Sequence, residues 1–147
     1  MTVVLVHHAD AVDPSVDPQR PLSTRGRAQC EELAARAGER GLRPHHIWHS
    51  GKLRSKQTAE AFWRICNPFA EFRMVKGLRP EDAPSLIRTA IDLEDQDLLL
   101  VSHMPLLPAL ARSLSSGIDS FPMNGFVVLE RRQDGTYVER WRDRPSV

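Results

Sequence analysis

Cysteine is scarce in this sequence, because Cys30 and Cys66 are the only two in 147 residues. So few thiols exclude a small fold held together by several disulfides. Both cysteines fall in stretches with helical spacing of apolar residues. We therefore expect buried structural thiols in a reducing compartment, although the sequence alone leaves a disulfide between them open.

An excess of charge of either sign is also lacking, since the formal net charge is +1. Without a basic excess we expect no nucleic-acid partner, and without an acidic tail we expect no dedicated basic partner. Any electrostatic function must therefore come from charges that are clustered locally.

Long hydrophobic runs are missing as well. No segment approaches the roughly 20 consecutive apolar residues that a membrane-spanning helix needs. The apolar run from Thr2 to Val6 is short and has no basic region before it, so it does not resemble a secretion signal. We expect a cytoplasmic protein without a membrane partner.

Repeats, low-complexity tracts and linkers are absent, which predicts a single domain over residues 1–147. Hydrophobic periodicity then predicts strands that alternate with helices, followed by a C-terminal hairpin around the turn at residues 133–135. The expected strands are 3–6, 45–49, 72–75, 98–101, 126–131 and 136–141, and the expected helices are 24–40, 53–66, 86–93 and 105–115. This order is typical of a three-layer α/β/α sandwich with a mostly parallel central sheet and an antiparallel hairpin at its end.

Polar side chains follow three of the predicted strands, at the points where the chain leaves the sheet. His7, His8 and Asp10 follow the first strand, Ser50 to Thr58 follow the second, and His103 follows the strand that ends at Val101. Ligands of open α/β sheets bind beyond the carboxyl ends of the strands. If these strands are parallel and adjacent, the three groups converge on one site.

These residue types suit phosphoryl transfer. The planar guanidinium of Arg54 can bind two phosphate oxygens at once. A neutral histidine such as His8 or His103 can attack phosphorus and form a phosphoramidate that water then hydrolyses. Positioning and positive charge around the phosphate supply most of the remaining catalysis. The sequence therefore predicts a phosphate site that needs neither a metal nor another cofactor.

The order of four motifs resembles the histidine phosphatase superfamily, also called phosphoglycerate mutase-like, and within it the short SixA-type phosphohistidine phosphatases. The motifs here are residues 5–11 (LVHHADA), 20–26 (RPLSTRG), 50–58 (SGKLRSKQT) and 101–105 (VSHMP). The resemblance runs from the first strand to the C-terminal hairpin. It implies a hydrolase of the histidine phosphatase fold.

The resemblance also implies a role for each matching residue. His8 would be the catalytic nucleophile, its ring oriented by the carbonyl of Ala9, while Arg54 and His103 would bind the phosphate. Ser23 would add a hydroxyl at the edge of the pocket. Many relatives carry a carboxylate that protonates the leaving group, and Glu81 and Asp82 are candidates for it by position alone.

One position departs from the family pattern, because His7 stands where the family has an arginine. Histidine is charged only part of the time near neutral pH. A His7 cation would replace the arginine and would lose phosphate affinity as the pH rises from about 6 to about 8. Alternatively, Arg20 or Lys52 fills the gap, or phosphate binding persists while catalysis is weak or lost.

Other histidines and basic residues have plainer interpretations. We interpret His45, His46 and His49 as surface residues rather than metal ligands, because successive strand residues point to opposite faces. The basic residues near the motifs are either an ordinary exposed surface or a rim that attracts anions; they are Arg20, Arg25, Arg27, Lys52 and Lys56. Trp48, Phe62 and Trp63 are expected in the core.

The leading functional hypothesis is a metal-independent phosphatase that works through phospho-His8. The segment between His8 and Arg54 is compact, which leaves little chain for a lid and favours a phosphohistidine or another phosphoprotein over a small phosphate ester. The second hypothesis is a module that binds phosphate or a phosphoprotein without turnover. A metal-dependent hydrolase using His8, Asp10 and His103 is the weakest reading. We make no prediction about the oligomeric state.

Overall fold

The computed structural model describes residues 1–147 and consists of one six-stranded sheet and four helices. The strands are β1 (Thr2–His7), β2 (His46–His49), β3 (Glu71–Met74), β4 (Leu98–Ser102), β5 (Phe126–Arg131) and β6 (Tyr137–Asp143). The helices are α1 (Thr24–Glu39), α2 (Leu53–Cys66), α3 (Pro84–Leu93) and α4 (Leu106–Leu114).

The strand order across the sheet is β3-β2-β4-β1-β5-β6. β3, β2, β4 and β1 run parallel, whereas β5 pairs antiparallel with β1 and β6 antiparallel with β5. This confirms a mostly parallel sheet with an antiparallel C-terminal hairpin. It also means that the carboxyl ends of β1, β2 and β4 and the amino end of β5 lie at one edge.

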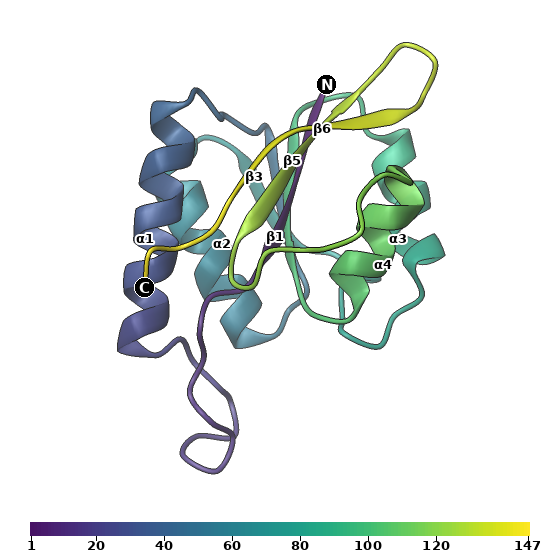
Figure 1. Cartoon of the computed structure of the whole chain (residues 1–147). Coiled ribbons are helices and arrows are strands. Elements are labelled where there is room, and N and C mark those ends of the chain that lie inside the picture. The colour runs from purple at the N-terminus through teal and green to yellow at the C-terminus, as the bar shows by residue number, and fades with distance from the viewer.

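Helices cover both faces of the sheet, as Figure 1 shows with α1 and α2 on one side and α3 and α4 on the other. β1 explains why both faces must be covered: Val3 and Leu5 pack into one buried cluster, and Val4 and Val6 pack into the other. A strand that is apolar on both faces needs a helical layer on each. The three-layer α/β/α architecture is therefore confirmed.

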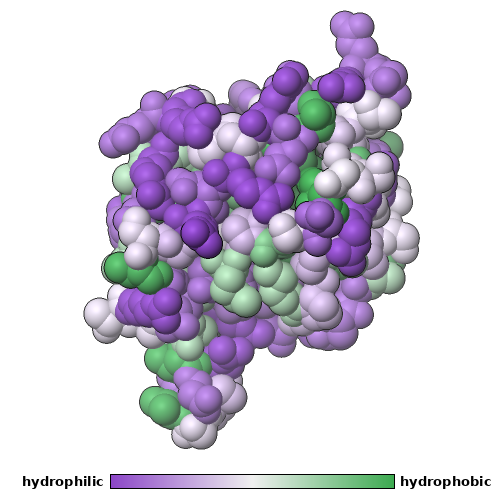
Figure 2. Space-filling model, viewed as in Figure 1, coloured by the Kyte–Doolittle hydropathy of each residue, from purple (hydrophilic) through white to green (hydrophobic).

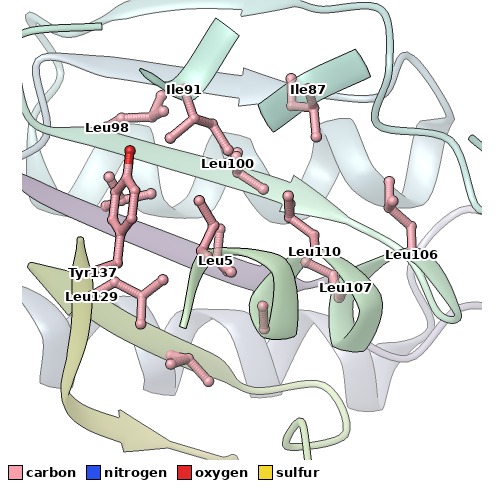
Figure 3. Close-up of a cluster of buried hydrophobic side chains, with 14 of the residues drawn as sticks. Leu5, Ile87, Ile91, Leu98, Leu100, Leu106, Leu107, Leu110, Leu129 and Tyr137 are labelled. Carbon is pink, nitrogen blue, oxygen red and sulfur yellow. The ribbon is translucent and has the colours of Figure 1, made fainter. Parts of the chain in front are cut away.

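The cluster beneath α3 and α4 is shown in Figure 3. Leu5 and Leu100 lie on the sheet and meet Leu107 and Leu110 from α4. Tyr137 closes the cluster from β6, and its buried ring keeps a polar partner because its hydroxyl donates to Oδ1 of Asp92 at 2.8 Å. The cluster fixes α4 against β4, and the chain between them carries His103.

Most predicted boundaries agree with the structure to within two residues. α1 begins after Ser23, whose hydroxyl accepts from the N–H of Gly26, and ends beside Arg40. α2 has the predicted bounds. No helix has both the length and the apolar character to span a bilayer.

Two expectations about single residues were wrong. His49 was predicted at the surface but is only 5% exposed, because its Nδ1 accepts from the N–H of Gly51 and its ring lies against Phe72. Trp63 was predicted in the core but is only partly buried, since it stacks on Phe72 beside the edge strand. Trp48 and Phe62 are buried as expected. Both cysteines are free and buried.

Candidate active site

The three predicted groups follow strands that are adjacent in the sheet. In the register of the sheet, His7 lies opposite Ser102 and His49 lies opposite Val101. The chain therefore leaves β1, β2 and β4 at the same level. His8, Arg54 and His103 are brought to this edge, which satisfies the geometric condition for one shared site.

His8 is held with one ring nitrogen occupied and the other free. Its Nδ1 lies 2.7 Å from the carbonyl oxygen of Ala9. A carbonyl only accepts hydrogen bonds, so Nδ1 carries the proton and the lone pair lies on Nε2. The N–H of Ala9 is in turn bound by Oγ1 of Thr58 at 3.0 Å. This arrangement presents Nε2 of His8 as a nucleophile.

His103 is almost fully buried beside His8, with the two ring centroids 5.1 Å apart. Its Nε2 lies 2.6 Å from the hydroxyl oxygen of Ser50. Its Nδ1 is buried and has no partner within the protein. Buried polar atoms are rarely left without a partner, so this atom marks a place for a ligand.

Arg54 is the second residue of α2 and contributes another such atom. Its Nε is buried without a hydrogen-bond partner. No side chain caps the N-terminus of α2, so amide groups of its first turn are free beside the guanidinium. Helix N-termini attract anions because their N–H groups and dipole are positive. Guanidinium and helix end together suit a phosphate.

His7 is held differently from the arginine that it replaces. Its Nδ1 accepts from the backbone N–H of Asn124 at 2.8 Å, while the side-chain amide of Asn124 donates to the carbonyl of His8 at 2.8 Å. Its ring lies 4.5 Å from that of His8, centroid to centroid. An Nδ1 that accepts is unprotonated, so neutral His7 carries its proton on Nε2.

The three histidines are neutral because of burial and neighbouring positive charge. Burial, followed by His8 and Arg54, lowers the pKa of His7 to about 3. Burial, followed by Arg54 and Arg20, lowers the pKa of His8 to about 4, and the Ala9 carbonyl and the Asp10 carboxylate oppose this. Burial, followed by its charged neighbours, lowers the pKa of His103 to about 2. His7 is therefore neutral in the unliganded site, and the His7 cation in a phosphate-bound site stays a prediction.

Arg20 and Lys52, the two alternative cations, both act on the site electrostatically. The charge of Arg20 lowers the pKa of His8 and of Arg54, and Lys52 lowers that of His103. Arg20 sits in the loop that projects from the body below α1 in Figure 1 and has a φ of 50°. Its Nε donates to the carbonyl of Val12, which leaves the terminal nitrogens for an anion.

Ser23 is close to the site but its hydroxyl is already used. Its Oγ accepts from the N–H of Gly26 and donates to Oδ2 of Asp10 at 2.6 Å. The single hydroxyl proton is thus committed, and none is left to donate to a phosphate. Ser23 thus ties α1 to the loop after His8, and its expected place at the edge of the phosphate pocket stays a prediction.

The two candidate proton donors lie in the loop after Leu78, which is bound to β4 by a hydrogen bond from Ser102 to the Leu78 carbonyl. Asp82 accepts from the N–H of Arg79, and Glu81 is exposed. Neither is hydrogen-bonded to a site residue. Asp10 is the one carboxylate whose charge shifts the pKa of His8, which makes it a further candidate.

Three supporting residues were missed as functional residues by sequence reasoning: Ser50, Thr58 and Asn124. Ser50 and Thr58 stand in the third motif at its two ends, so the motif itself carried the signal. No sequence signal identified Asn124, because it lies outside the four motifs, just before the antiparallel strand β5. Its positive φ of 56° is one that asparagine tolerates better than most residues.

No group of three His, Cys, Asp or Glu side chains is placed to hold a metal ion. The reading of His8, Asp10 and His103 as metal ligands therefore has no ligand set. The main surface hollows of the protein do not include His7, His8, Arg54 or His103. Of the three site histidines, His7 and His103 are buried and His8 is partly exposed.

Known structures share this architecture over almost the whole chain. The protein histidine phosphatase SixA complexed with tungstate aligns with 99% of this chain and 97% of its own, at 23% identity and a TM-score of 0.89. A putative phosphohistidine phosphatase SixA from Agrobacterium tumefaciens aligns with 99% of this chain and 98% of its own, at 25% identity and a TM-score of 0.82. A mycobacterial glucosyl-3-phosphoglycerate phosphatase aligns with 95% of this chain and 98% of its own, at 17% identity and a TM-score of 0.72.

Sequence comparison gives less. No family model matches the chain. An uncharacterised protein from Picosynechococcus is 29% identical over 121 residues, which are 79% of this chain and 72% of that protein. The sheet order, the helical layers and these structural alignments together show that the chain has the histidine phosphatase fold, in the form shared by the SixA phosphohistidine phosphatases.

Proposed function

We propose that this protein is a phosphatase that removes a phosphoryl group from phosphohistidine or another phosphoprotein through a phosphohistidine intermediate on His8. One observation carries the proposal. His8 lies beside His103 and within reach of the charge of Arg54, and Nδ1 of His103 and Nε of Arg54 are both buried and unpartnered. A phosphate placed there gives both atoms a partner and brings phosphorus to the nucleophile.

The reaction then has two steps. The Nε2 lone pair of His8 attacks phosphorus, a new N–P bond forms, and the bond from phosphorus to the leaving nitrogen or oxygen breaks with its electron pair going to the leaving atom. Water then attacks the phosphoryl group, the N–P bond breaks with its electron pair returning to Nε2, and the proton that the water loses stays on the released phosphate or passes to solvent. Arg54, neutral His7 and the N-terminus of α2 hold the phosphoryl oxygens through both steps.

The low pKa of His8 fits the first step. A histidine with a pKa of about 4 is unprotonated at neutral pH and has its lone pair available. The hydrogen bond to Ala9 stabilises the positive charge that develops on the ring as the N–P bond forms. The tungstate in the similar SixA structure is an oxyanion, which agrees with an oxyanion site in this fold.

The compact segment between His8 and Arg54 supports a protein-borne substrate, because it leaves little chain to form a lid over the site. A phosphohistidine on a protein surface can approach such a site without a conformational change in the enzyme. Asp10, Glu81 and Asp82 are the candidates for protonating a poorer leaving group such as an alkoxide.

The decisive experiment measures phosphate release from an aryl phosphate and from a phosphohistidine-bearing protein, for the native chain and for His8→Ala. We expect turnover by the native chain, at least about 100-fold less by His8→Ala, and an acid-labile phosphoenzyme in the native protein only. Equal rates in the two proteins would refute the role of His8.

The second candidate is a phosphoprotein-binding module, which the neutral His7 favours because one cation of the family pattern is missing. It predicts oxyanion binding without phosphate release from either substrate. Detecting turnover that depends on His8 excludes it. Binding of sulfate without any turnover establishes it instead.

A further inference from the structure

A hollow of about 530 Å³ adjoins the candidate active site. Its walls come from the start of α1, the loop before β5, and β6 with the C-terminal segment. Figure 1 shows the C-terminal segment and the loop before β5 on the same side of the molecule. None of the residues assigned to phosphate binding lies in its wall, so it is a separate surface.

Asn124 joins this hollow to the site. It lines the hollow, and its backbone N–H and side-chain amide bind His7 and His8. Another hollow of about 530 Å³, between α1 and the residues after it, includes no residue that contacts the site histidines. A chain whose phosphohistidine enters the site can therefore continue into the first hollow.

The charged side chains that line the hollow are all positive. Arg25, Arg142 and Arg144 line it, and no aspartate or glutamate does. Glu139 pairs with Arg142, but the guanidinium groups of Arg25 and Arg144 make no hydrogen bond or ion pair. A neighbouring hollow on the other side of α1 differs, since Glu31 and Glu60 balance its two arginines. Two unpaired cations in a concave surface select an anionic ligand.

The floor also offers a limited apolar contact. Met123 is 63% exposed and stands with Phe121 and Pro122 in the wall. Methionine adapts its shape to different partners. Figure 2 shows this side of the protein as mainly hydrophilic, with hydrophobic residues exposed only in small areas. Such a surface suits a transient partner rather than a permanent subunit.

We propose that this hollow docks an acidic segment flanking the phosphorylated residue of a protein substrate, with Arg25 and Arg144 binding its carboxylates and Met123 contacting an apolar side chain. The proposal rests on the proposed phosphatase function and adds its substrate class. It also gives the site a way to distinguish a phosphoprotein from a small phosphate ester.

The test uses two synthetic phosphohistidine peptides that differ only in whether Asp or Lys flanks the phosphohistidine, together with an aryl phosphate. We expect the native chain to prefer the Asp peptide by about tenfold in kcat/KM, since each exposed ion pair contributes little. In Arg25→Glu/Arg144→Glu the preference disappears or reverses, while kcat/KM for the aryl phosphate stays unchanged. A preference that survives the double substitution overturns the proposal.

Arg112→Glu/Arg132→Glu is the matched control. Both residues are exposed, their side chains make no hydrogen bond or ion pair, and they lie on α4 and beside the hairpin turn. The control must keep the preference for the Asp peptide. If it loses the preference equally, overall charge rather than the hollow is responsible, and the proposal fails.

A binding measurement separates this proposal from the phosphatase function. Fluorescence anisotropy with the unphosphorylated Asp peptide needs no turnover. We expect salt-sensitive binding to the native chain that Arg25→Glu/Arg144→Glu weakens at least about fivefold. Binding that both proteins share, or that neither shows, overturns the docking surface even if phosphatase activity is present. Binding without any activity preserves the surface and refutes the phosphatase.

Discussion

The hydroxyl of Ser50 lies 2.6 Å from Nε2 of His103. Only if Ser50 donates this hydrogen bond does the proton of His103 sit on Nδ1, the buried atom that has no partner. We infer that Ser50 donates this hydrogen bond and acts as a positioning residue that sets the tautomer of His103. A proton on Nδ1 can be donated to a phosphoryl oxygen.

Ser50→Ala should weaken sulfate binding and kcat/KM for an aryl phosphate by about three- to tenfold, the value of one hydrogen bond. Nitrogen-15 NMR of His103 should show the proton leaving Nδ1 for part of the population. Ser50→Thr keeps a hydroxyl and should restore the tautomer. An unchanged NMR signature in Ser50→Ala would refute the assignment.

Sulfate affinity should be nearly independent of pH between about 6 and about 8. The pKa of His7 is lowered to about 3, mainly by burial, so His7 is neutral across this range and donates one hydrogen bond through Nε2. Sulfate remains a dianion over this pH range, whereas phosphate changes its charge there through its second ionisation. Sulfate therefore reports only the titration of the protein. A steady loss of affinity with rising pH would support the hypothesis that a His7 cation binds the anion.

His7→Gln should retain most of the sulfate affinity, because glutamine can accept from Asn124 and donate to the anion. His7→Leu has a similar volume without either function and should bind about five- to tenfold more weakly. Comparable affinities for the two variants would show that His7 does not contact the anion.

The free energy of unfolding should fall as the solution is acidified. The pKa values of His7 and His103 are lowered from 6.5 to about 3 and about 2, so between these values the unfolded chain binds more protons than the folded one. Their contribution to stability is complete above the unfolded pKa and is lost as pH falls below it.

At about pH 5, each of these two histidines should lower the free energy of unfolding by about 2 kcal/mol relative to neutral pH. Urea titrations at several pH values measure the loss. In His103→Gln, the slope of the unfolding free energy against pH should correspond to about one proton fewer. Sulfate should restore part of the stability, since an anion favours the histidinium. A flat profile from neutral pH to about pH 5 would contradict the buried neutral state.

Gly26→Ala should destabilise the protein by about 1–3 kcal/mol or more. A Cβ at this position would lie 1.9 Å from the carbonyl oxygen of Asp10, which is part of the loop that follows His8. Phosphatase activity should fall with stability because that loop must move.

Gly38→Ala in the same helix is the control for this substitution. Its Cβ would make ordinary van der Waals contact with Ile65, at 3.8 Å from the side chain and 3.9 Å from the backbone oxygen, so the gain in helix propensity should stabilise by about 0.5–1 kcal/mol. Chemical denaturation compares the two variants. Equal effects would show that the close approach to Asp10 does not explain the glycine.

Sequence periodicity predicted the fold well because the signals are local. Continuous apolar runs at β1 and β4 identified the central strands, and α2 was predicted residue for residue. The convergence of His8, Arg54 and His103 followed from one rule about parallel strands.

The protonation of His7 was not predictable in the same way. It depends on burial and on the amide of Asn124, and both arise from pairing between β1 and β5. The hydrogen bond from Ser23 to Asp10 was not predicted for a related reason, because this acceptor becomes a neighbour only when the loop folds back. Contacts between distant segments were thus the part that local patterns did not reveal.

The position of β1 has a consequence for how this protein is made. β1 emerges from the ribosome before its neighbours β4 and β5, which come about a hundred residues later in the chain. The ring of His7 can contact Asn124 only after the 117 residues that separate them in sequence have been translated. A partly synthesised chain therefore has no assembled oxyanion site, and oxyanion binding during refolding would report completion of the sheet rather than early collapse.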